Sequence, residues 1–317
     1  MHRQRTHLAA RVTHVANALE RRGIATTYKL HDRALANRSS RRLFSGAHVD
    51  LDDTQRRIVD ALDADGFVVV PFEELLPDEE LRSAVLAQGD AFVADTERGL
   101  ASEAEGAEAT LRRRAGKEFV VRAYSFESVT LDLARDAWFR ACISRRLLDI
   151  ANSYLRMWAK LSYVDLWYTA PQPAGAERTA SQLWHRDFDD QHLLKAFLYL
   201  VDVDASAGPF EYVGGSQPGG RHKETRQWAP MRTGRFTEEE VNKHVPADAI
   251  QTFTAPRGTV ILCNTSGLHR GGFATEHPRA LATATYCSPA SLKALSDRNY
   301  KLAGEPPADP AARFATT

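Results

Sequence analysis

The sequence lacks the features that mark several broad classes of protein. Its 317 residues include only three cysteines, none in a CxxC pair, so neither a disulfide framework nor a zinc ribbon is expected. No apolar run approaches the roughly 20 residues that span a bilayer. The formal net charge is zero, which argues against a global attraction to nucleic acid or membrane. We therefore expect no nucleic-acid or membrane partner, and a reducing, cytoplasmic location.

The charge that is present is unevenly distributed. Residues 1–50 carry nine Arg and one Lys against three acidic residues, which gives a local charge near +7. An Arg-rich, acid-poor start can resemble an organellar transit peptide. However, a secretory hydrophobic segment is missing, and the apolar residues from Val12 to Leu19 have helical spacing. We expect residues 1–50 to form an exposed, basic helical arm or lid.

Helix-forming segments dominate the chain before residue 160. One begins after Asp52 and ends at Gly66, one begins after Pro77, and one covers 129–157. Residues 67–72 and 119–121 are expected strands, and 99–117 is an expected mobile stretch. Beyond residue 160, short β-rich runs alternate with Gly and Pro turns. These runs are 163–169, 194–201, 210–213, 250–254, 259–263 and 280–287.

This order of elements predicts one mainly β domain over residues 51–317. Its strand core covers about 160–290 and forms an antiparallel barrel or sandwich with a helical buttress. Residues 221–248 form a long insertion within that core. Loops of that length in compact domains often carry function.

Two histidines and one aspartate form the most informative pattern. In a strand, residues two apart face the same side, so His185 and Asp187 point into one cavity. His269 can supply a third ligand. Two His and one carboxylate leave three positions of an octahedron open, which suits non-haem Fe(II), whereas structural zinc uses four protein ligands. The pattern is weak alone, because a chain with 11 His can contain His-x-Asp by chance.

Arg279 follows ten residues after His269, at the start of the expected strand 280–287. An arginine that enters a strand beside a metal can bind a carboxylate through two parallel hydrogen bonds. Taken alone, an arginine after a proline turn is more often a surface residue. The order His-x-Asp, His and Arg is what favours a metal site with an acidic cosubstrate.

The chain resembles the phytanoyl-CoA dioxygenase-like family of Fe(II)/2-oxoglutarate-dependent dioxygenases over roughly residues 51–290. The matching segments are Trp184-His185-Arg186-Asp187-Phe188, Ala207 to Ser216, Gly258 to Leu262, Leu268 to Gly272, Arg279, and the opening 51–70. One departure is Gly214-Gly215-Ser216-Gln217, where relatives often have Pro-Gly-Ser-His. The resemblance implies a distorted double-stranded β-helix, of jelly-roll or cupin type, with helices packed outside.

The resemblance also implies roles for individual residues. His185, Asp187 and His269 would bind Fe(II), and Arg279 would hold the distal carboxylate of 2-oxoglutarate, with O2 as the other reactant. A small or polar residue usually lies near this arginine, and Thr283 or Thr285 is expected there.

No motif fixes the group that binds the 1-carboxylate of 2-oxoglutarate. Lys195 and Tyr168 are the candidates, although Lys195 could equally be an edge-strand lysine that extends to solvent. Trp184, Asn264 and Ser266 are expected to orient the two imidazoles.

Four further residues are candidate substrate contacts: Lys117, Arg122, Trp228 and Arg221. A solvated charged surface would account equally for the basic ones. The remaining histidines that could be mistaken for ligands are His192, His222, His244 and His277.

The expected activity is hydroxylation of a small molecule, either a natural-product intermediate or an amino-acid derivative, with release of succinate and CO2. Halogenating relatives replace the ligand carboxylate by Ala or Gly, so Asp187 predicts that the enzyme does not halogenate. Three alternatives stay open: the same chemistry on an acyl-CoA; desaturation, cyclisation or epimerisation; and a non-catalytic binding barrel. A cupin-type isomerase would need no cosubstrate and would leave Arg279 with nothing to hold.

Overall fold

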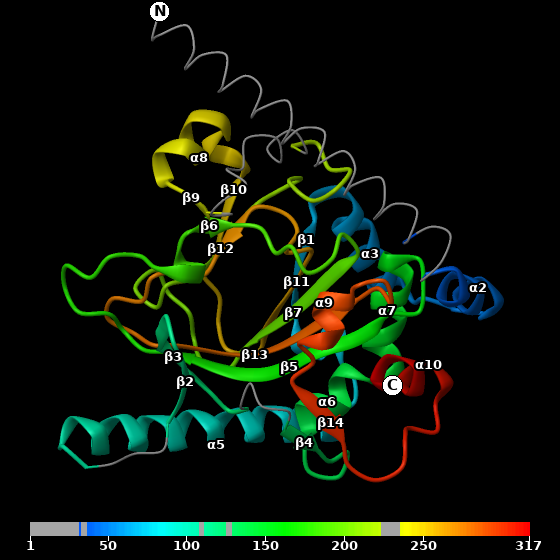
Figure 1. Ribbon diagram of the computed structural model, residues 1–317, viewed down its shortest axis with the longest axis horizontal. Helices are drawn as coiled ribbons and strands as arrows, with labels where there is room; N and C mark the ends of the chain where they lie inside the picture. Colours follow the sequence, from blue (N-terminus) through cyan, green and yellow to red (C-terminus); the bar gives the residue numbers. More distant parts are fainter. Residues whose placement is uncertain (1–31, 33–36, 108–110, 125–128, 223–234) are drawn as a thin grey trace, which may run out of the picture.

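The computed structural model describes residues 32, 37–107, 111–124, 129–222 and 235–317. Two antiparallel sheets face each other across the interior, and helices cover the outer side of the larger sheet (Figure 1). In the described part, no strand of one sheet pairs with a strand of the other. The fold is therefore an open sandwich rather than a closed barrel, and the mainly β class with a helical buttress is confirmed.

The larger sheet has seven strands in the order β1-β11-β7-β13-β5-β3-β2, and every neighbouring pair is antiparallel. Its strands are β1 (Phe67–Pro71), β2 (Arg112–Arg114), β3 (Lys117–Arg122), β5 (Lys160–Thr169), β7 (Leu193–Tyr199), β11 (Thr259–Cys263) and β13 (Arg279–Cys287). The neighbours are rarely consecutive in sequence, so long connections cross between the sheets.

The smaller sheet has five strands in the order β10-β8-β12-β6-β9. They are β6 (Trp184–His185), β8 (Phe210–Val213), β9 (Arg235–Phe236), β10 (Ile250–Phe253) and β12 (His269–Arg270). A separate parallel pair joins β4 (Val129–Leu131) and β14 (Tyr300–Leu302).

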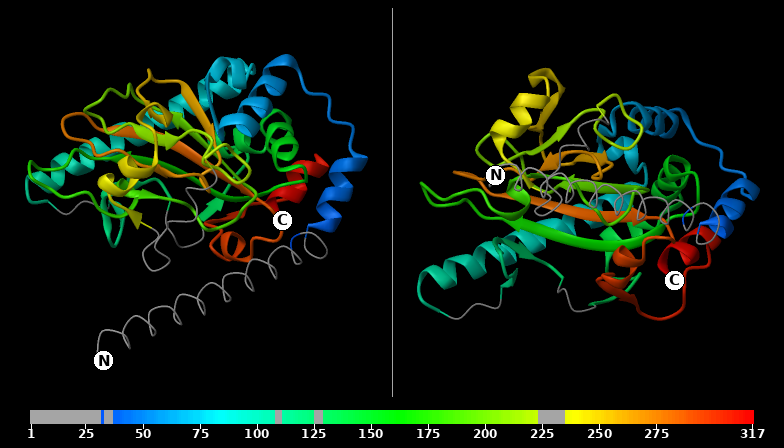
Figure 2. Two further views of the ribbon diagram at one scale, coloured as in Figure 1. Left: turned by 90° about the horizontal axis from the view of Figure 1, so that it is seen from above. Right: turned by 45° about the horizontal axis from the view of Figure 1, so that its top comes forward.

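The larger sheet rests on α5 and α6, while α8 lies beyond the smaller sheet, on the opposite side of the molecule (Figures 1 and 2). The helices are α2 (Arg38–Gly46), α3 (Asp53–Asp65), α4 (Phe72–Leu75), α5 (Glu79–Ala104), α6 (Ala137–Cys142), α7 (Arg145–Leu155), α8 (Glu238–His244), α9 (Leu292–Ser296) and α10 (Pro310–Thr316). None of these described helices has the length and hydrophobicity that crossing a membrane requires.

Helix α3 begins and ends where its sequence predicts. The Asp52 side chain accepts a hydrogen bond from the Gln55 backbone N–H, and the Gln55 side chain bonds back to the Asp52 N–H, which forms a capping box. Gly66 ends the helix with φ +79°, a conformation that favours glycine. A Cβ at this position would also collide with Tyr212 and Gln217. The close turn leads directly into β1.

Successive side chains of the central strands point alternately to the helix-covered core and to the interior between the sheets. On β13, Ala280, Ala282 and Ala284 are fully buried against the helices. Leu281 packs instead among aromatic residues between the two sheets. Because successive side chains of a strand point to opposite faces, the residues at odd positions of β13 face the interior of the sandwich.

The structure corrects the helix predicted over 129–157. Residues Val129–Leu131 pair with the distant strand β14, and two helices follow, α6 and α7. Ser144 separates them, because its side chain accepts a hydrogen bond from the Leu147 backbone N–H and so begins a new helix. Apolar spacing alone could not distinguish one interrupted helix from one continuous helix.

The stretch 99–117, which we expected to be mobile, is largely ordered in its described part. Helix α5 continues to Ala104, and the Leu111 side chain lies where a side chain at Gly99 would be. Arg113 forms two hydrogen bonds to the Glu103 carboxylate, which link β2 back to the helix. These contacts join residues that composition alone suggested were unstructured.

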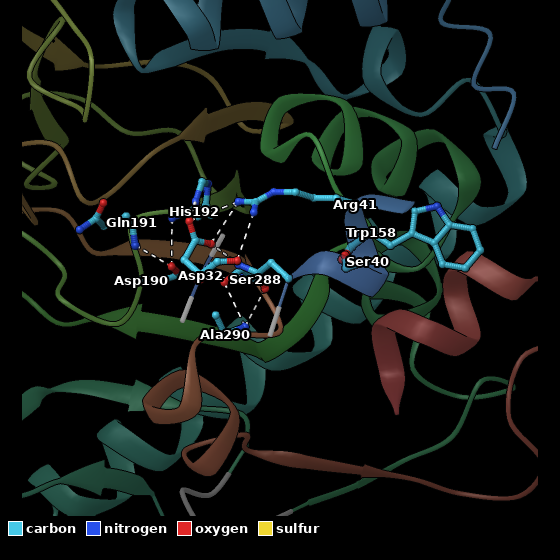
Figure 3. Close-up of polar contacts among 10 residues, drawn as sticks. Asp32, Ser40, Arg41, Trp158, Asp190, Gln191, His192, Ser288 and Ala290 are labelled. Atoms are coloured by element: carbon cyan, nitrogen blue, oxygen red, sulfur yellow. Dashed lines mark hydrogen bonds and ion pairs between the residues drawn. The ribbon is translucent and has the colours of Figure 1, made fainter. Parts of the chain in front are cut away.

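A buried polar cluster fixes part of the basic N-terminal segment (Figure 3). The Asn37 amide donates to Asp32 and accepts from the Ala290 backbone N–H at 2.9 Å. Asp32 also pairs with Arg41 and with His192, at 3.1 and 3.2 Å. Asn37 is fully buried, whereas most side chains of α2 are exposed, so the described part of residues 1–50 is attached to the domain through a few buried residues.

The same cluster reaches the loop that follows β6. The Asp190 carboxylate accepts hydrogen bonds from the backbone N–H groups of Gln191, His192 and Ser288. The loop is therefore held from two sides, by residue 288 after β13 and by Asp32.

Candidate metal centre

Strand register brings the two histidines together. His185 on β6 lies directly opposite His269 on β12, and their ring centroids are 4.3 Å apart. Asp187 follows just after β6, and its backbone N–H donates to the Thr265 carbonyl at 2.8 Å. Residues 84 apart in sequence, His185 and His269, thus become neighbours because the two short strands pair in this one register.

The three side chains have the geometry of one metal site. Their ligand atoms all lie within 4.8 Å of one another, and within the described part they are the one such group of His, Cys, Asp or Glu. His185 Nε2 lies 3.9 Å from Asp187 Oδ1, and His269 Nε2 lies 3.8 Å from Asp187 Oδ2. These separations are short enough that one metal ion could be held by all three side chains.

Hydrogen bonds fix which imidazole nitrogen is available. His185 Nδ1 contacts the Leu183 carbonyl at 2.8 Å, and His269 Nδ1 contacts the Gly267 carbonyl at 3.0 Å. A carbonyl can only accept, so both Nδ1 atoms carry the proton and both Nε2 lone pairs face the site. We had expected Trp184, Asn264 and Ser266 to orient the imidazoles. Main-chain carbonyls orient them instead.

Electrostatics keep all three donors in the form that binds a metal. Burial lowers the pKa of His269 to about 4 and, with the neighbouring His269, holds the pKa of His185 well below its usual range. Burial alone would raise the pKa of Asp187, but Lys195 and the two imidazoles outweigh it, and the pKa falls. Two neutral imidazoles and a carboxylate are the donor set that Fe(II) takes in facial sites.

Arg186, between the first two ligands, holds the site from behind. Its side chain points to the opposite face, where Nη1 donates to the carbonyls of Ser216 and Ser266 at 2.9 Å each. The Ser216 hydroxyl in turn accepts from the Leu268 backbone N–H at 2.7 Å. This linkage ties the His185 segment to the His269 segment. The one signal for this role in the sequence was the position of Arg186 between two residues that face inward.

Lys195 lies beside the metal ligands. Its Nζ is 2.6 Å from Asp187 Oδ2, and this carboxylate outweighs burial to raise the pKa of the lysine. Strand β7 is flanked by β11 and β13, so Lys195 is not on an edge strand and does not extend to solvent. The charge of the carboxylate is already balanced within the protein by an ammonium group.

Arg279 is buried at the start of β13 and lines the same cavity as the three ligands. One guanidinium nitrogen donates to the Gly208 carbonyl, and Nε has no hydrogen-bond partner among the residues that the structure describes. No acidic side chain of the described residues pairs with it, and burial lowers its pKa. A buried arginine without a carboxylate partner is costly unless a ligand supplies one, which fits 2-oxoglutarate.

Gln182 is a site residue that sequence reasoning missed. It is 1% exposed and lines the same cavity. Its carbonyl oxygen accepts from the Thr179 N–H at 2.9 Å, while its amide nitrogen has no hydrogen-bond partner in the described part of the chain. An amide nitrogen in this position is a donor for an oxygen-rich ligand. Its place three residues before His185 was the one indication in the sequence.

Two cavities meet at the metal site. The smaller, of ≈ 100 Å³, is lined by the triad, Arg279 and Gln182. The larger, of ≈ 490 Å³, extends along β13 and includes Thr283 and Thr285 in its wall. Both cavities include Lys117, Arg122, Trp167, Asp187 and Lys195. The residues expected to contact substrate at 117 and 122 are therefore brought to the site.

Tyr168 and Thr283, which we expected to bind the cosubstrate, do not lie where that role requires. Tyr168 packs in the core on the helix side of β5, and its hydroxyl faces Glu97 of α5. Trp167 and Thr169 face the cavity instead, because neighbouring residues of a strand alternate. Thr283 is four residues from Arg279 along the strand, or about 13 Å, which is too far to share its ligand. We therefore correct the roles expected for Tyr168 and Thr283.

The candidates in the insertion give a mixed result. Arg221 is exposed, pairs with Asp65 and packs on Gly215, away from both cavities. Its expected contact with substrate is therefore corrected. Trp228 lies outside the described residues. His192 and His277 do not belong to the cluster of possible metal donors found in the described residues, and they pair instead with Asp32 and Asp204.

Comparison with solved structures finds similar folds at low identity. The non-heme alpha ketoglutarate dependent epimerase SnoN from nogalamycin biosynthesis is 19% identical, with a TM-score of 0.49, over 81% of this chain and 92% of that one. EctD from S. alaskensis with bound Fe is 19% identical, with a TM-score of 0.46, over 77% and 81%. HygX from Streptomyces hygroscopicus, with nickel and 2-oxoglutarate bound, is 19% identical, with a TM-score of 0.46, over 75% and 88%.

TM-scores below 0.5 are too low to assign a substrate or a reaction type to this chain. Comparison with curated proteins finds no match. The family comparison is decisive, because the model of the phytanoyl-CoA dioxygenase (PhyH) family matches residues 62–280. That range contains all three metal donors and Arg279, and it confirms the resemblance drawn from the motifs. The chain belongs to the phytanoyl-CoA dioxygenase (PhyH) family and is an Fe(II)/2-oxoglutarate-dependent oxygenase.

Proposed function

We propose that this protein hydroxylates a small molecule, using Fe(II) held by His185, Asp187 and His269 and 2-oxoglutarate held by Arg279. Bound iron, with 2-oxoglutarate and O2, supplies the oxidising chemistry: substrate C–H becomes C–OH, and the cosubstrate leaves as succinate and CO2. The observation that carries the proposal is Arg279, a buried cation without an acidic partner among the described residues, in the cavity of an intact metal triad.

The protein's own residues have separate tasks in this scheme. The Leu183 and Gly267 carbonyls hold the imidazoles in the metal-binding tautomer. Arg279 fixes the distal carboxylate of the cosubstrate, and the partnerless amide of Gln182 and the ammonium of Lys195 are the donors available for its other oxygens. Phe197, Phe210 and Leu281 line the smaller cavity and exclude water from it.

The intact carboxylate of Asp187 favours hydroxylation over halogenation. A halide needs a ligand position that this chain fills with Asp187, which also forms an ion pair with Lys195. Removing the carboxylate to admit a halide would leave that buried ammonium without its partner.

Succinate formation tests the proposal. The full chain with Fe(II), 2-oxoglutarate and O2 should release succinate, and His185→Ala should abolish the release. His48→Ala, an exposed histidine in the loop between α2 and α3, is the matched control and should keep full activity. A product heavier than its substrate by one oxygen atom would support hydroxylation. Loss of two hydrogens or an unchanged mass would contradict it in favour of desaturation or epimerisation.

The cosubstrate part is tested by Arg279→Gln. The KM for 2-oxoglutarate should rise by about 10- to 100-fold, the equivalent of a lost charge-assisted hydrogen bond, while iron still binds. Arg257→Gln, which removes an exposed arginine paired with Asp90, is the control. Equal 2-oxoglutarate affinity in Arg279→Gln and the wild-type protein would rule out the assigned role.

We infer a reducing, cytoplasmic setting with a small molecule as the partner. The three cysteines are buried free thiols, and none forms a disulfide. Cell fractionation with a tagged full chain tests the location, and recovery in an organelle fraction would contradict it.

A further inference from the structure

The larger cavity is where a substrate has room. Arg279 and Gln182 line only the smaller cavity, so a cosubstrate held by Arg279 lies there. The larger cavity continues on the other side of Asp187 and Lys195. A molecule in it would meet the metal site from the side opposite to the arginine.

Positive charge is concentrated where the two cavities join. Lys117, at the start of β3, lines both. Among the residues that the structure describes, it has no hydrogen-bond or ion-pair partner in contact, and the acid that acts on it is Asp187, which is already paired with Lys195. Arg122, Lys195 and Arg235 repel its charge.

The other cations around this cavity are engaged. Arg122 donates to the Tyr163 hydroxyl at 2.6 Å, lies 3.6 Å from Asp165 and stacks over Trp167. Arg298 donates to main-chain carbonyls near the C-terminus, and Arg114, which also lines this cavity, is not without a partner. Asp189 and Asp297 also line this cavity. Lys117 is therefore the lysine of the wall that is left to bind a ligand.

The aromatic wall next to Lys117 is rigid. Trp167 Nε1 donates to Tyr163 and to Asp165, at 3.1 and 3.2 Å, and the Tyr163 hydroxyl donates to Asp165 at 2.5 Å. Asp165 is fully buried and also accepts from the Tyr124 backbone N–H. A wall fixed by this many hydrogen bonds presents Lys117 with a stable neighbour and a defined cavity shape.

We infer that the larger cavity binds a polar small molecule through an anionic group, a carboxylate or a phosphate, that pairs with the Lys117 ammonium. The inference rests on the proposed function for the position of the reacting carbon, since the anion would anchor one end of the substrate while the other lies at the metal. A half-buried ammonium without a partner is the group that an anion would stabilise most. The threonine, serine and aspartate side chains of the cavity wall offer the remaining polar contacts.

Ligand binding without turnover tests this inference. The full chain is loaded with Ni(II) and saturating 2-oxoglutarate, so that the smaller cavity is filled. It is then titrated with phenylacetate, phenyl phosphate and the neutral 2-phenylethanol, with tryptophan fluorescence or calorimetry as the readout. The anions should bind, and the neutral analogue should bind at least about tenfold more weakly. Whichever anion binds more tightly identifies the carboxylate or the phosphate class.

Variants assign the effect to one residue. Lys117→Met keeps most of the length of the side chain but removes the ammonium, and it should weaken anion binding by about 10- to 100-fold, while Lys117→Arg should retain it. Lys243→Met, on the distant helix α8, is the matched control. The inference is overturned if Lys117→Met binds the anions as the wild-type protein does, if the neutral analogue binds equally well, or if no anion binds in the millimolar range.

The failure of this inference can be separated from the failure of the proposed function. Metal and 2-oxoglutarate binding are measured first, before any probe is added. If both bind and the anions do not, only the assignment of the larger cavity falls. If neither binds, the proposed function falls, whatever the anions do.

Discussion

At the scale of single residues, this site depends on which buried polar atoms have partners. The Nδ1 atoms of His185 and His269 are occupied by carbonyls, and Asp187 is paired with Lys195. Arg279 Nε and the Gln182 amide nitrogen are not occupied. Because an unsatisfied buried polar atom costs about 1–3 kcal/mol, these groups together point to a ligand rich in oxygen atoms.

The pH dependence of anion binding should report on Lys117. Burial, followed by repulsion from Arg122, lowers the pKa of its ammonium to about 8. The charged form binds the anion and is present below that pH, so affinity should be constant below pH 8. Above pH 8 it should fall, by about tenfold per unit well above the pKa.

Phenylacetate is the suitable probe for this measurement, because its own charge does not change near pH 8. The facing groups do not titrate there: Asp187 stays ionised, the pKa of Lys195 is raised, and the arginines stay charged. In Lys117→Arg the break near pH 8 should disappear. A profile that is flat in the wild-type protein, or unchanged in Lys117→Arg, would contradict the assignment.

At the scale of elements, the metal site depends on two very short strands. β6 and β12 pair through one residue each, His185 opposite His269. A slip of one residue in either strand would turn the imidazole of that strand to the outer face of the sheet. Contacts outside the strands hold this register, chiefly Arg186 to two carbonyls and Ser216 to Leu268.

The polar cluster around Asn37 should stabilise the fold, although Asn37 and Ala290 lie outside the residues that match the family model. Asn37→Ala removes two buried hydrogen bonds: the one that the Asn37 amide donates to Asp32, and the one that it accepts from the Ala290 backbone N–H. We expect a loss of about 1–2 kcal/mol in unfolding free energy. Urea or thermal denaturation measures this loss. The control is Ser39→Ala, at an exposed position of α2, the helix that Asn37 precedes. It should change the free energy of unfolding by less than about 0.5 kcal/mol. Equal stability of the two variants would show that the cluster contributes nothing.

At the scale of the whole molecule, the two sheets supply the halves of the site. The smaller sheet positions both histidines, while the larger carries Lys117, Lys195 and Arg279 on its inner face. The helices pack on the other face of the larger sheet, against its alanines. A ligand bound between the sheets therefore links them.

Metal binding should consequently stabilise the fold. A ligand that binds only the folded state adds about 2.7 kcal/mol at 100 times its Kd, which for a chain of this size corresponds to several degrees in Tm. Differential scanning fluorimetry under argon, with and without Fe(II), measures the shift. A chelator should reverse it and His269→Ala should abolish it, with His48→Ala as the matched control. An equal shift in His269→Ala would place the metal elsewhere.

Much of the site could be predicted from the sequence, because its chemistry resides in residue types at short spacings. His185 and Asp187 are two apart, and the resemblance supplied His269 and Arg279. The sequence also placed strands at 163–169 and 280–287, close to where they are. It wrongly placed Tyr168 at the cavity, which its neighbour Trp167 lines instead, because the sequence of a strand buried on two faces does not show which side faces the site.

By itself, the sequence determined the family, the three donors and the mainly β class, since these depend on local patterns. Only the tertiary structure decided that Lys195 pairs with Asp187, that carbonyls orient the imidazoles, and that Lys117 has no partner among the described residues. Each of these facts depends on atoms from segments far apart in the chain. Their distances are set by strand register and by packing between the sheets, neither of which local spacing encodes.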